Sequence, residues 1–293
     1  MENERVYLAS LEQVLNDGQS RLDRTGTGTR SIFGCQMRFD ISEYMPVITT
    51  KQLPWKHCIK ELLWFLSGST DAQLLQSQGV KIWDGNSSRA FLDGRGLTEL
   101  PEGDIGPGYG FQWRHFGAEY ATCKDDYAGK GTDQIAQVLD MLKTDPFSRR
   151  IFFTAWNPAS LDKMALPPCH VSAQFYVTEQ DGQRKLSCHM YQRSVDLFLG
   201  EPWNILSYAV MTALFAKLTD MTPHELIIST GDTHIYNDHV EQVKLQLSRE
   251  PFPPPKLIIS DAVKEKPLEQ ITLADFELTD YNHHPAIKAT MSV

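Results

Sequence analysis

The sequence has no uninterrupted run of about 18 apolar residues, so it offers no candidate for a membrane-spanning helix. Its first residues, from Met1 to Arg5, lack the basic and then apolar pattern of a secretory signal peptide. The cysteines are odd in number, five, and no Cys-x-x-Cys spacing occurs, which is typical of reduced thiols. We therefore expect a cytoplasmic protein with no membrane partner.

A positive charge balance is also missing. The chain carries 28 Lys and Arg against 37 Asp and Glu, a formal net charge of -9. Because nonspecific DNA binding depends on neutralising many phosphates, DNA is not an expected partner. A few arginines that converge in a cleft could still bind one small anion.

Known metal and dinucleotide motifs are absent too. There is no His-Glu-x-x-His, and the glycines at 26 and 28 do not form a G-x-G-x-x-G motif after a strand. We expect no metal and no nicotinamide cofactor, and we expect residues 26–28 to form a loop. With 41% hydrophobic and 22% charged residues, no repeat and no linker, the composition predicts a single globular domain over residues 1–293.

Periodicity predicts an α+β fold. Apolar spacing near 3.6 residues predicts helices at about 6–16, 55–66, 133–143 and 205–218, the last apolar on nearly every side and therefore buried. Strands are expected at about 150–156, 170–177, 185–192, 225–230 and 256–259, with a hairpin turn at Asp181-Gly182. Because these strands cluster in the second half and do not alternate with helices, we expect one large mixed sheet covered by helices.

Cys169 is the most informative single residue. Two prolines precede it and His170 follows it, so the thiol begins a strand beside a group that could order a thiolate or water. A buried structural cysteine is the alternative that the tetrapeptide alone leaves open.

Two pairs of residues that contain arginine flank this cysteine. Arg149-Arg150 precede it and Arg193-Ser194 follow it, each pair beside an expected strand. Guanidinium groups and a hydroxyl group in such positions suit a phosphate dianion, although solvated surface arginines remain the alternative.

Polar residues near the expected buried helix are candidates for base and sugar recognition. Asn204 is either the N-cap of that helix or an amide that reads uracil, because Asn offers one acceptor and two donors. His234 and Tyr236 are expected on a connection between a strand and a helix, where they could bind a hydroxyl group or serve packing.

Several longer strings, taken together and in order, carry a family resemblance. They are DRTGTGT at 23–29, ELLWF at 61–65, KIWD at 81–84, GFQWR at 110–114, PCH at 168–170, YQRS at 191–194 and GDTHIY at 231–236. The chain resembles the folate-dependent, non-flavin thymidylate synthase family nearly from end to end. The last residues, 291–293, resemble that family's closing C-terminal tail.

The resemblance implies a methyltransferase that makes dTMP from dUMP with 5,10-methylenetetrahydrofolate as co-substrate, without a metal, nicotinamide or flavin. Cys169 would add to C6 of uracil, Glu61 would organise proton transfers, Tyr109 would assist loss of the C5 proton, and His170 would order water. Asn204, which would read the uracil, completes this catalytic set. It further implies three groups of ligand-binding residues: Arg24, Arg193, Ser194 and the partner's Arg149 and Arg150 for the phosphate; Asn204, His234, Tyr236 and Asp196 for the rest of dUMP; and Trp83, Asp196, Gly200 and Val293 for the folate. A sheet face would form the homodimer interface.

Four residues depart from the family pattern: Gly108, Trp203, Leu206 and Asp238 replace Val, Phe, Ala and Asn. Three of them surround the base and folate pocket, so a reshaped pocket could admit water. A dUMP hydroxymethylase with the same covalent mechanism is therefore the second candidate function. A binding protein without catalysis is disfavoured because every expected reactive residue is present.

Overall fold

The computed structural model describes residues 2–23 and 26–291. Two of the expected ligand-binding residues, Arg24 and Val293, lie outside these described residues. Among the described helices, none has both the length and the apolar composition that crossing a membrane requires.

A six-stranded sheet forms the centre of the molecule, with strand order β1-β2-β6-β5-β4-β3. Strands β5 and β6 run parallel, and every other neighbouring pair is antiparallel, so the sheet is mixed as predicted. A separate pair, β7 and β8, is antiparallel. The bounds are β1 Gln19–Arg21, β2 Thr29–Asp40, β3 Phe152–Thr154, β4 His170–Gln180, β5 Gln183–Asp196, β6 Thr222–Tyr236, β7 Lys256–Ile259 and β8 Phe276–Thr279.

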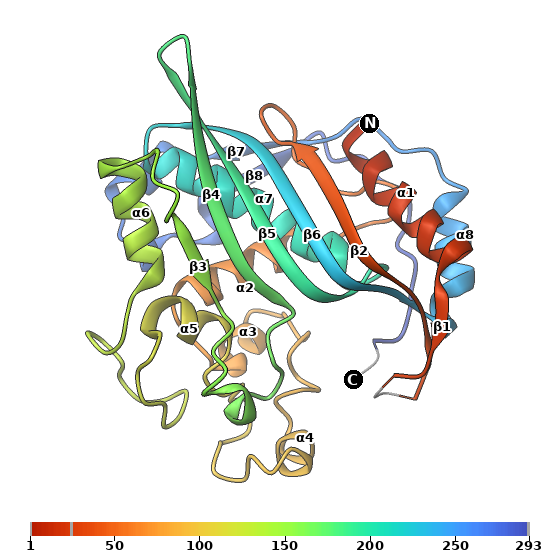
Figure 1. Cartoon of the computed structure of the whole chain (residues 1–293), viewed down its shortest axis with the longest axis horizontal. Coiled ribbons are helices and arrows are strands. Elements are labelled where there is room, and N and C mark those ends of the chain that lie inside the picture. Colours follow the sequence, from red (N-terminus) through yellow and green to blue (C-terminus); the bar gives the residue numbers. More distant parts are fainter. Residues whose placement is uncertain (1, 24–25, 292–293) are drawn as a thin grey trace.

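Helices pack against one side of this sheet, and no helix of the described residues crosses the near face in Figure 1. Helices α7 and α2 lie behind the sheet, α1 lies beside β2, and α8 packs against α1 (Figure 1). The bounds are α1 Glu2–Asp17, α2 Trp55–Leu66, α3 Ala72–Ser77, α4 Arg89–Gly94, α5 Tyr109–His115, α6 Gln134–Thr144, α7 Gly200–Leu218 and α8 Val240–Leu247. The α+β prediction is confirmed.

Helix α7 is the core helix. It packs against β5 and β6 on one side and against α2 on the other. Apolar residues on all sides of the helix are therefore covered by other parts of the protein. Residues from Ile205 to Ala216 are all buried. The prediction of a helix apolar on nearly every side is therefore confirmed, and its rigid packing fixes the position of the polar residues at its start.

The hairpin between β4 and β5 also follows its local sequence. Asp181 and Gly182 both have positive φ angles, 53° and 75°, which a type I′ hairpin turn requires. The early strand β2, in contrast, was not predicted. It pairs with β6 over most of its length, so its place in the sheet depends on residues some 200 positions away rather than on its own pattern.

Three expectations about the ends of elements are wrong. Asn204 is not the N-cap of α7, because the helix begins at Gly200 and Leu199 occupies the cap. His234 and Tyr236 lie in the last residues of β6 rather than on a connection. Arg193 lies inside β5, with Ser194, because pairing with β6 continues to Asp196.

Candidate active site

Cys169 lies directly before β4 and is held by its backbone. Its N–H donates to the hydroxyl oxygen of Tyr109 at 2.8 Å, and its carbonyl accepts from the backbone N–H of Arg193 at 2.9 Å. The residue is half-buried. The prolines at 167 and 168 and these two bonds fix the backbone that carries the thiol.

The guanidinium group of Arg193 folds back onto the same segment. Nε donates to the carbonyl oxygen of Pro168 at 2.7 Å, and Nη2 donates to that of Pro167 at 2.9 Å. Nη2 also lies 3.9 Å from Sγ of Cys169. Burial raises the pKa of the Cys169 thiol, while the Arg193 charge and the Tyr109 hydrogen bond act to lower it.

His170 is enclosed by rings. It stacks on Tyr109 with a centroid separation of 4.1 Å, and its Nδ1 shares a hydrogen bond of 2.9 Å with the hydroxyl group of Tyr208. Burial lowers the pKa of His170 to about 3. The imidazole is therefore neutral near pH 7, so one ring nitrogen donates a hydrogen bond and the other accepts one.

Glu61 is a buried carboxyl group on α2. Its Oε1 accepts from the indole N–H of Trp83 at 2.7 Å, and its Oε2 accepts from that of Trp203 at 2.5 Å. Burial raises the pKa of Glu61 to about 7, and the two indole donors oppose this rise. A carboxyl group with this pKa can donate or accept a proton at neutral pH.

The start of α7 presents further polar groups. Oδ1 of Asp196 accepts from the backbone N–H groups of Phe198 and Leu199 at 3.0 and 3.1 Å, which fixes the turn before Gly200. Asn204 is half-buried in the first turns of the helix. Within the described residues its side chain makes no hydrogen bond, so its amide is available to a ligand.

The parallel pairing of β5 and β6 brings the predicted sugar-binding residues to this end of the sheet. Ser194 pairs with Asp232, and Asp196 pairs with His234. Nδ1 of His234 lies 3.1 Å from Oδ1 of Asp232, and its ring meets Tyr236 edge-on. Strand register thus gathers residues that sequence spacing alone cannot relate.

Arg149 and Arg150 do not join this cluster. Both are exposed, and they precede β3, where Phe152 pairs with Gln174 of β4. Arg150 is therefore level with about the seventh residue beyond Cys169, which at about 3.3 Å per residue is roughly 20 Å along the strand. An arginine side chain cannot span this distance within one subunit.

Two residues that hydrogen-bond to side chains of the site, Trp203 and Tyr208, were not among the predicted site residues. Trp203 appeared only as a departure from the family pattern, and its hydrogen bond to Glu61 depends on the packing of α7 against α2. Tyr208 lies in an apolar stretch, and nothing in its local sequence signals its contact with His170.

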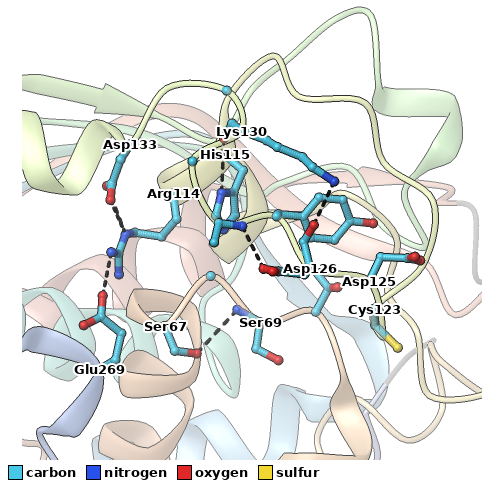
Figure 2. Close-up of a pocket in the computed structure, with 16 residues that line it drawn as sticks. Ser67, Ser69, Arg114, His115, Cys123, Asp125, Asp126, Lys130, Asp133 and Glu269 are labelled. Carbon is cyan, nitrogen blue, oxygen red and sulfur yellow. Dashed lines mark hydrogen bonds and ion pairs between the residues drawn. The ribbon is translucent and has the colours of Figure 1, made fainter.

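A surface hollow of about 570 Å³ lies away from this site. Figure 2 shows that Arg114 points toward Asp133 and Glu269, and these groups form ion pairs. None of the predicted site residues lines it. The Arg114 guanidinium group is already held by these two carboxylates, and we do not assign the reaction to this hollow. Among the described residues no cluster of three or more His, Cys, Asp or Glu could hold a metal.

Comparison with known proteins identifies close relatives. The family described as thymidylate synthase matches residues 5–293. The chain is 52% identical to a thymidylate synthase of Saccharomyces cerevisiae, covering 99% of this chain and 97% of the relative. It is 50% identical to that of Homo sapiens, covering 99% and 91%, and 51% identical to that of human herpesvirus 8, covering 99% and 84%.

Proposed function

The chain belongs to the thymidylate synthase family and catalyses thymidylate synthesis, and we propose that it converts dUMP to dTMP with 5,10-methylenetetrahydrofolate through a covalent bond between Cys169 and the uracil ring. Residues 1–293 act as a single catalytic domain. The observation that carries the proposal is the position of Cys169: its backbone is bonded to Tyr109, its Sγ lies 3.9 Å from the Arg193 guanidinium group, and the buried His170 stacks on the same Tyr109.

The first step is nucleophilic addition. The Cys169 thiolate forms a bond to C6 of uracil, and the electron pair of the C5–C6 double bond moves toward C5 and O4. The Arg193 charge near Sγ supports the thiolate, and the rigid proline segment keeps it in place. C5 then bonds to the one-carbon unit of the folate. After C5 loses its proton, the bond between this carbon and the folate nitrogen breaks and leaves an exocyclic methylene group on C5. The released tetrahydrofolate transfers hydride to this methylene group and becomes dihydrofolate.

The following steps move protons. Tyr109 assists removal of the C5 proton, a role supported by the hydrogen bond that its oxygen accepts from the backbone of Cys169. Glu61, with a pKa of about 7, organises water and proton transfer to the base and folate. The neutral His170 orders water near O4. Elimination of the Cys169 thiolate after hydride transfer releases dTMP.

The uracil and the sugar are recognised by residues in the first turns of α7 and in the last residues of β6. Asn204 presents a free amide that can pair with N3–H and O4 of uracil. His234 and Tyr236 bind the sugar hydroxyl group. Asp196, Gly200 and Trp83 bind the folate, with Asp196 next to dUMP as well, and Val293 closes the site.

The phosphate is bound by Arg24, Arg193 and Ser194, together with Arg149 and Arg150 from a second subunit. The distance of roughly 20 Å between Arg150 and the Cys169 of its own chain supports this arrangement. The helix-free face of the sheet supplies the interface. It exposes Phe33, Phe152, Tyr176 and Tyr191, whose exposed fractions are 42% or more, and covering such an apolar face is what a homodimer achieves.

Subunit exchange tests the shared site. We expect Arg149→Glu/Arg150→Glu and Cys169→Ser to be nearly inactive alone. After mixing and random exchange, each heterodimer keeps one intact site, so about a quarter of wild-type activity returns. If native mass spectrometry detects heterodimers and activity stays absent, the arginines do not act across the interface.

Product analysis tests the reaction. We expect dTMP and dihydrofolate from dUMP and methylenetetrahydrofolate, and 5-hydroxymethyl-dUMP as the main product would instead establish the hydroxymethylase. Cys169→Ser should abolish turnover and the covalent adduct with fluorinated dUMP seen by mass spectrometry. Cys35→Ser is the control, because Cys35 lies on β2 beside Ser10. Wild-type turnover by Cys169→Ser would reject the mechanism.

The compartment belongs to the same proposal. All five cysteines are free in the structure, and reduced thiols persist in the cytoplasm. We therefore assign the activity to the cytoplasm.

A further inference from the structure

The carboxyl group of Glu61 is held from two sides by indole rings. Trp83 donates to one oxygen, and Trp203, in the first turns of α7, donates to the other at 2.5 Å. Each oxygen thus receives one N–H. The carboxyl group cannot rotate about its terminal bond without losing both hydrogen bonds.

The two indole N–H groups are neutral, and no positively charged group among the described residues helps them to stabilise the Glu61 carboxylate. Glu61 is 7% exposed, and no cationic side chain of the described residues forms an ion pair with it. Burial raises the pKa of Glu61, and the two indole hydrogen bonds are what oppose that rise. Each donor therefore stabilises a substantial share of the buried negative charge.

Trp203 is one of the four residues noted above as departures from the pattern of the resembled family, where it stands in place of phenylalanine. Phenylalanine fills similar space but has no N–H to donate. The tryptophan therefore adds a donor, and it ties the helix that carries Asn204 to the helix that carries Glu61.

We propose that Trp203 is a positioning residue that fixes the second oxygen of Glu61 and keeps this carboxyl group ionised for proton transfer. This inference rests on the proposed role of Glu61. It assigns to a residue outside the predicted site a part in setting the working pH of the reaction.

Trp203→Phe tests the proposal because it removes the N–H and keeps a ring. The protonation of Glu61 is followed by its infrared carboxyl band, identified by the band that Glu61→Gln lacks. We expect the Glu61 transition to move to higher pH by about one unit, since one hydrogen bond to a charged group is lost. Circular dichroism and thermal unfolding establish that the variant is folded.

Trp55→Phe is the matched control. Trp55 lies on the same helix as Glu61, is half-buried, and donates its indole N–H to no group among the described residues. Its Glu61 transition should stay at the wild-type pH. An unchanged transition in Trp203→Phe, or an equal shift in Trp55→Phe, would overturn the proposal.

Steady-state kinetics provide the second readout. The pH dependence of kcat/KM for dUMP should move with the infrared transition in Trp203→Phe and not in Trp55→Phe. An infrared shift without a kinetic shift would contradict a part for Trp203 in the reaction. Absence of turnover in the wild-type protein would reject the proposed function instead, and the infrared titration would still decide whether Trp203 controls Glu61.

Discussion

The hydroxyl group of Tyr208 lies 2.9 Å from Nδ1 of His170, and both side chains are buried. His170 in turn stacks on Tyr109, whose oxygen accepts from the backbone of Cys169. Contacts therefore run from the core helix α7 to the reactive thiol. The core of the protein positions the site directly.

Removing this hydroxyl group should affect both stability and rate. In Tyr208→Phe, Nδ1 of His170 stays buried without its partner, which we expect to lower the unfolding free energy by about 1–3 kcal/mol. We also expect kcat to fall by about tenfold, because His170 loses its fixed orientation. Urea unfolding and steady-state kinetics measure the two effects. Tyr44→Phe, whose ring lies beside the ammonium group of Lys256, is the control and should change neither.

His170 should also make the protein sensitive to acid. Its pKa is about 3 in the folded protein and 6.5 ordinarily, so below about pH 6.5 the unfolded chain binds one proton more. Its contribution to stability is thus present above that pH and declines by about 1.4 kcal/mol per pH unit below it. Urea unfolding between about pH 7 and about pH 5 should show a shallower decline in His170→Gln. Equal slopes for the two proteins would contradict the prediction.

The sequence predicted well those elements whose residues carry a local signal. Helix α2 has its predicted bounds, and the turn at Asp181 and Gly182 requires positive φ angles that these residues tolerate. Strand β2 lacks such a signal, because Ile32, which packs against the core, is followed directly by the exposed Phe33, so apolar and polar residues do not alternate there. Pairing with a distant strand decides its structure.

The site likewise contains residues that local motifs predict and residues whose positions depend on tertiary packing. The residues at the Cys169 thiol could be named from motifs, and the structure does bring Tyr109, His170 and Arg193 to Cys169. The second donor to Glu61 could not be named, because it depends on how α7 crosses α2. The separation of Arg150 from the site required the register of β3 and β4.

Gly110 should be essential for the close packing of α5 on α2. A Cβ atom there would lie 2.7 Å from the carbonyl oxygen of Phe65 and 3.0 Å from that of Ser69. Because both obstacles are backbone atoms, we expect Gly110→Ala to lower the unfolding free energy by about 2 kcal/mol or more, and to lower kcat by displacing Tyr109. Gly94→Ala is the control, since its Cβ would meet nothing within 4 Å. Thermal unfolding would refute the argument if both variants matched the wild type.

Two buried glutamates differ in how their carboxyl groups are satisfied. Glu4 accepts from the backbone N–H and the hydroxyl group of both Thr49 and Thr50. Glu201, in the first turn of α7, is fully buried, and neither of its oxygens has a partner among the described residues. Burial raises the pKa of Glu201 well above its usual value.

Replacing each of these residues by methionine should therefore have opposite effects. Glu201→Met removes an unsatisfied buried group and should raise the unfolding free energy by about 1–3 kcal/mol, whereas Glu4→Met leaves four donors of the threonines unpaired and should lower it. Because the folded pKa of Glu201 is raised, the unfolded chain loses this proton first as pH rises above about 4.5, and the wild type loses stability there. The gain from Glu201→Met should accordingly grow with pH. Urea unfolding at several pH values measures it, and a gain that is absent or independent of pH would mean that Glu201 is ionised and paired in solution.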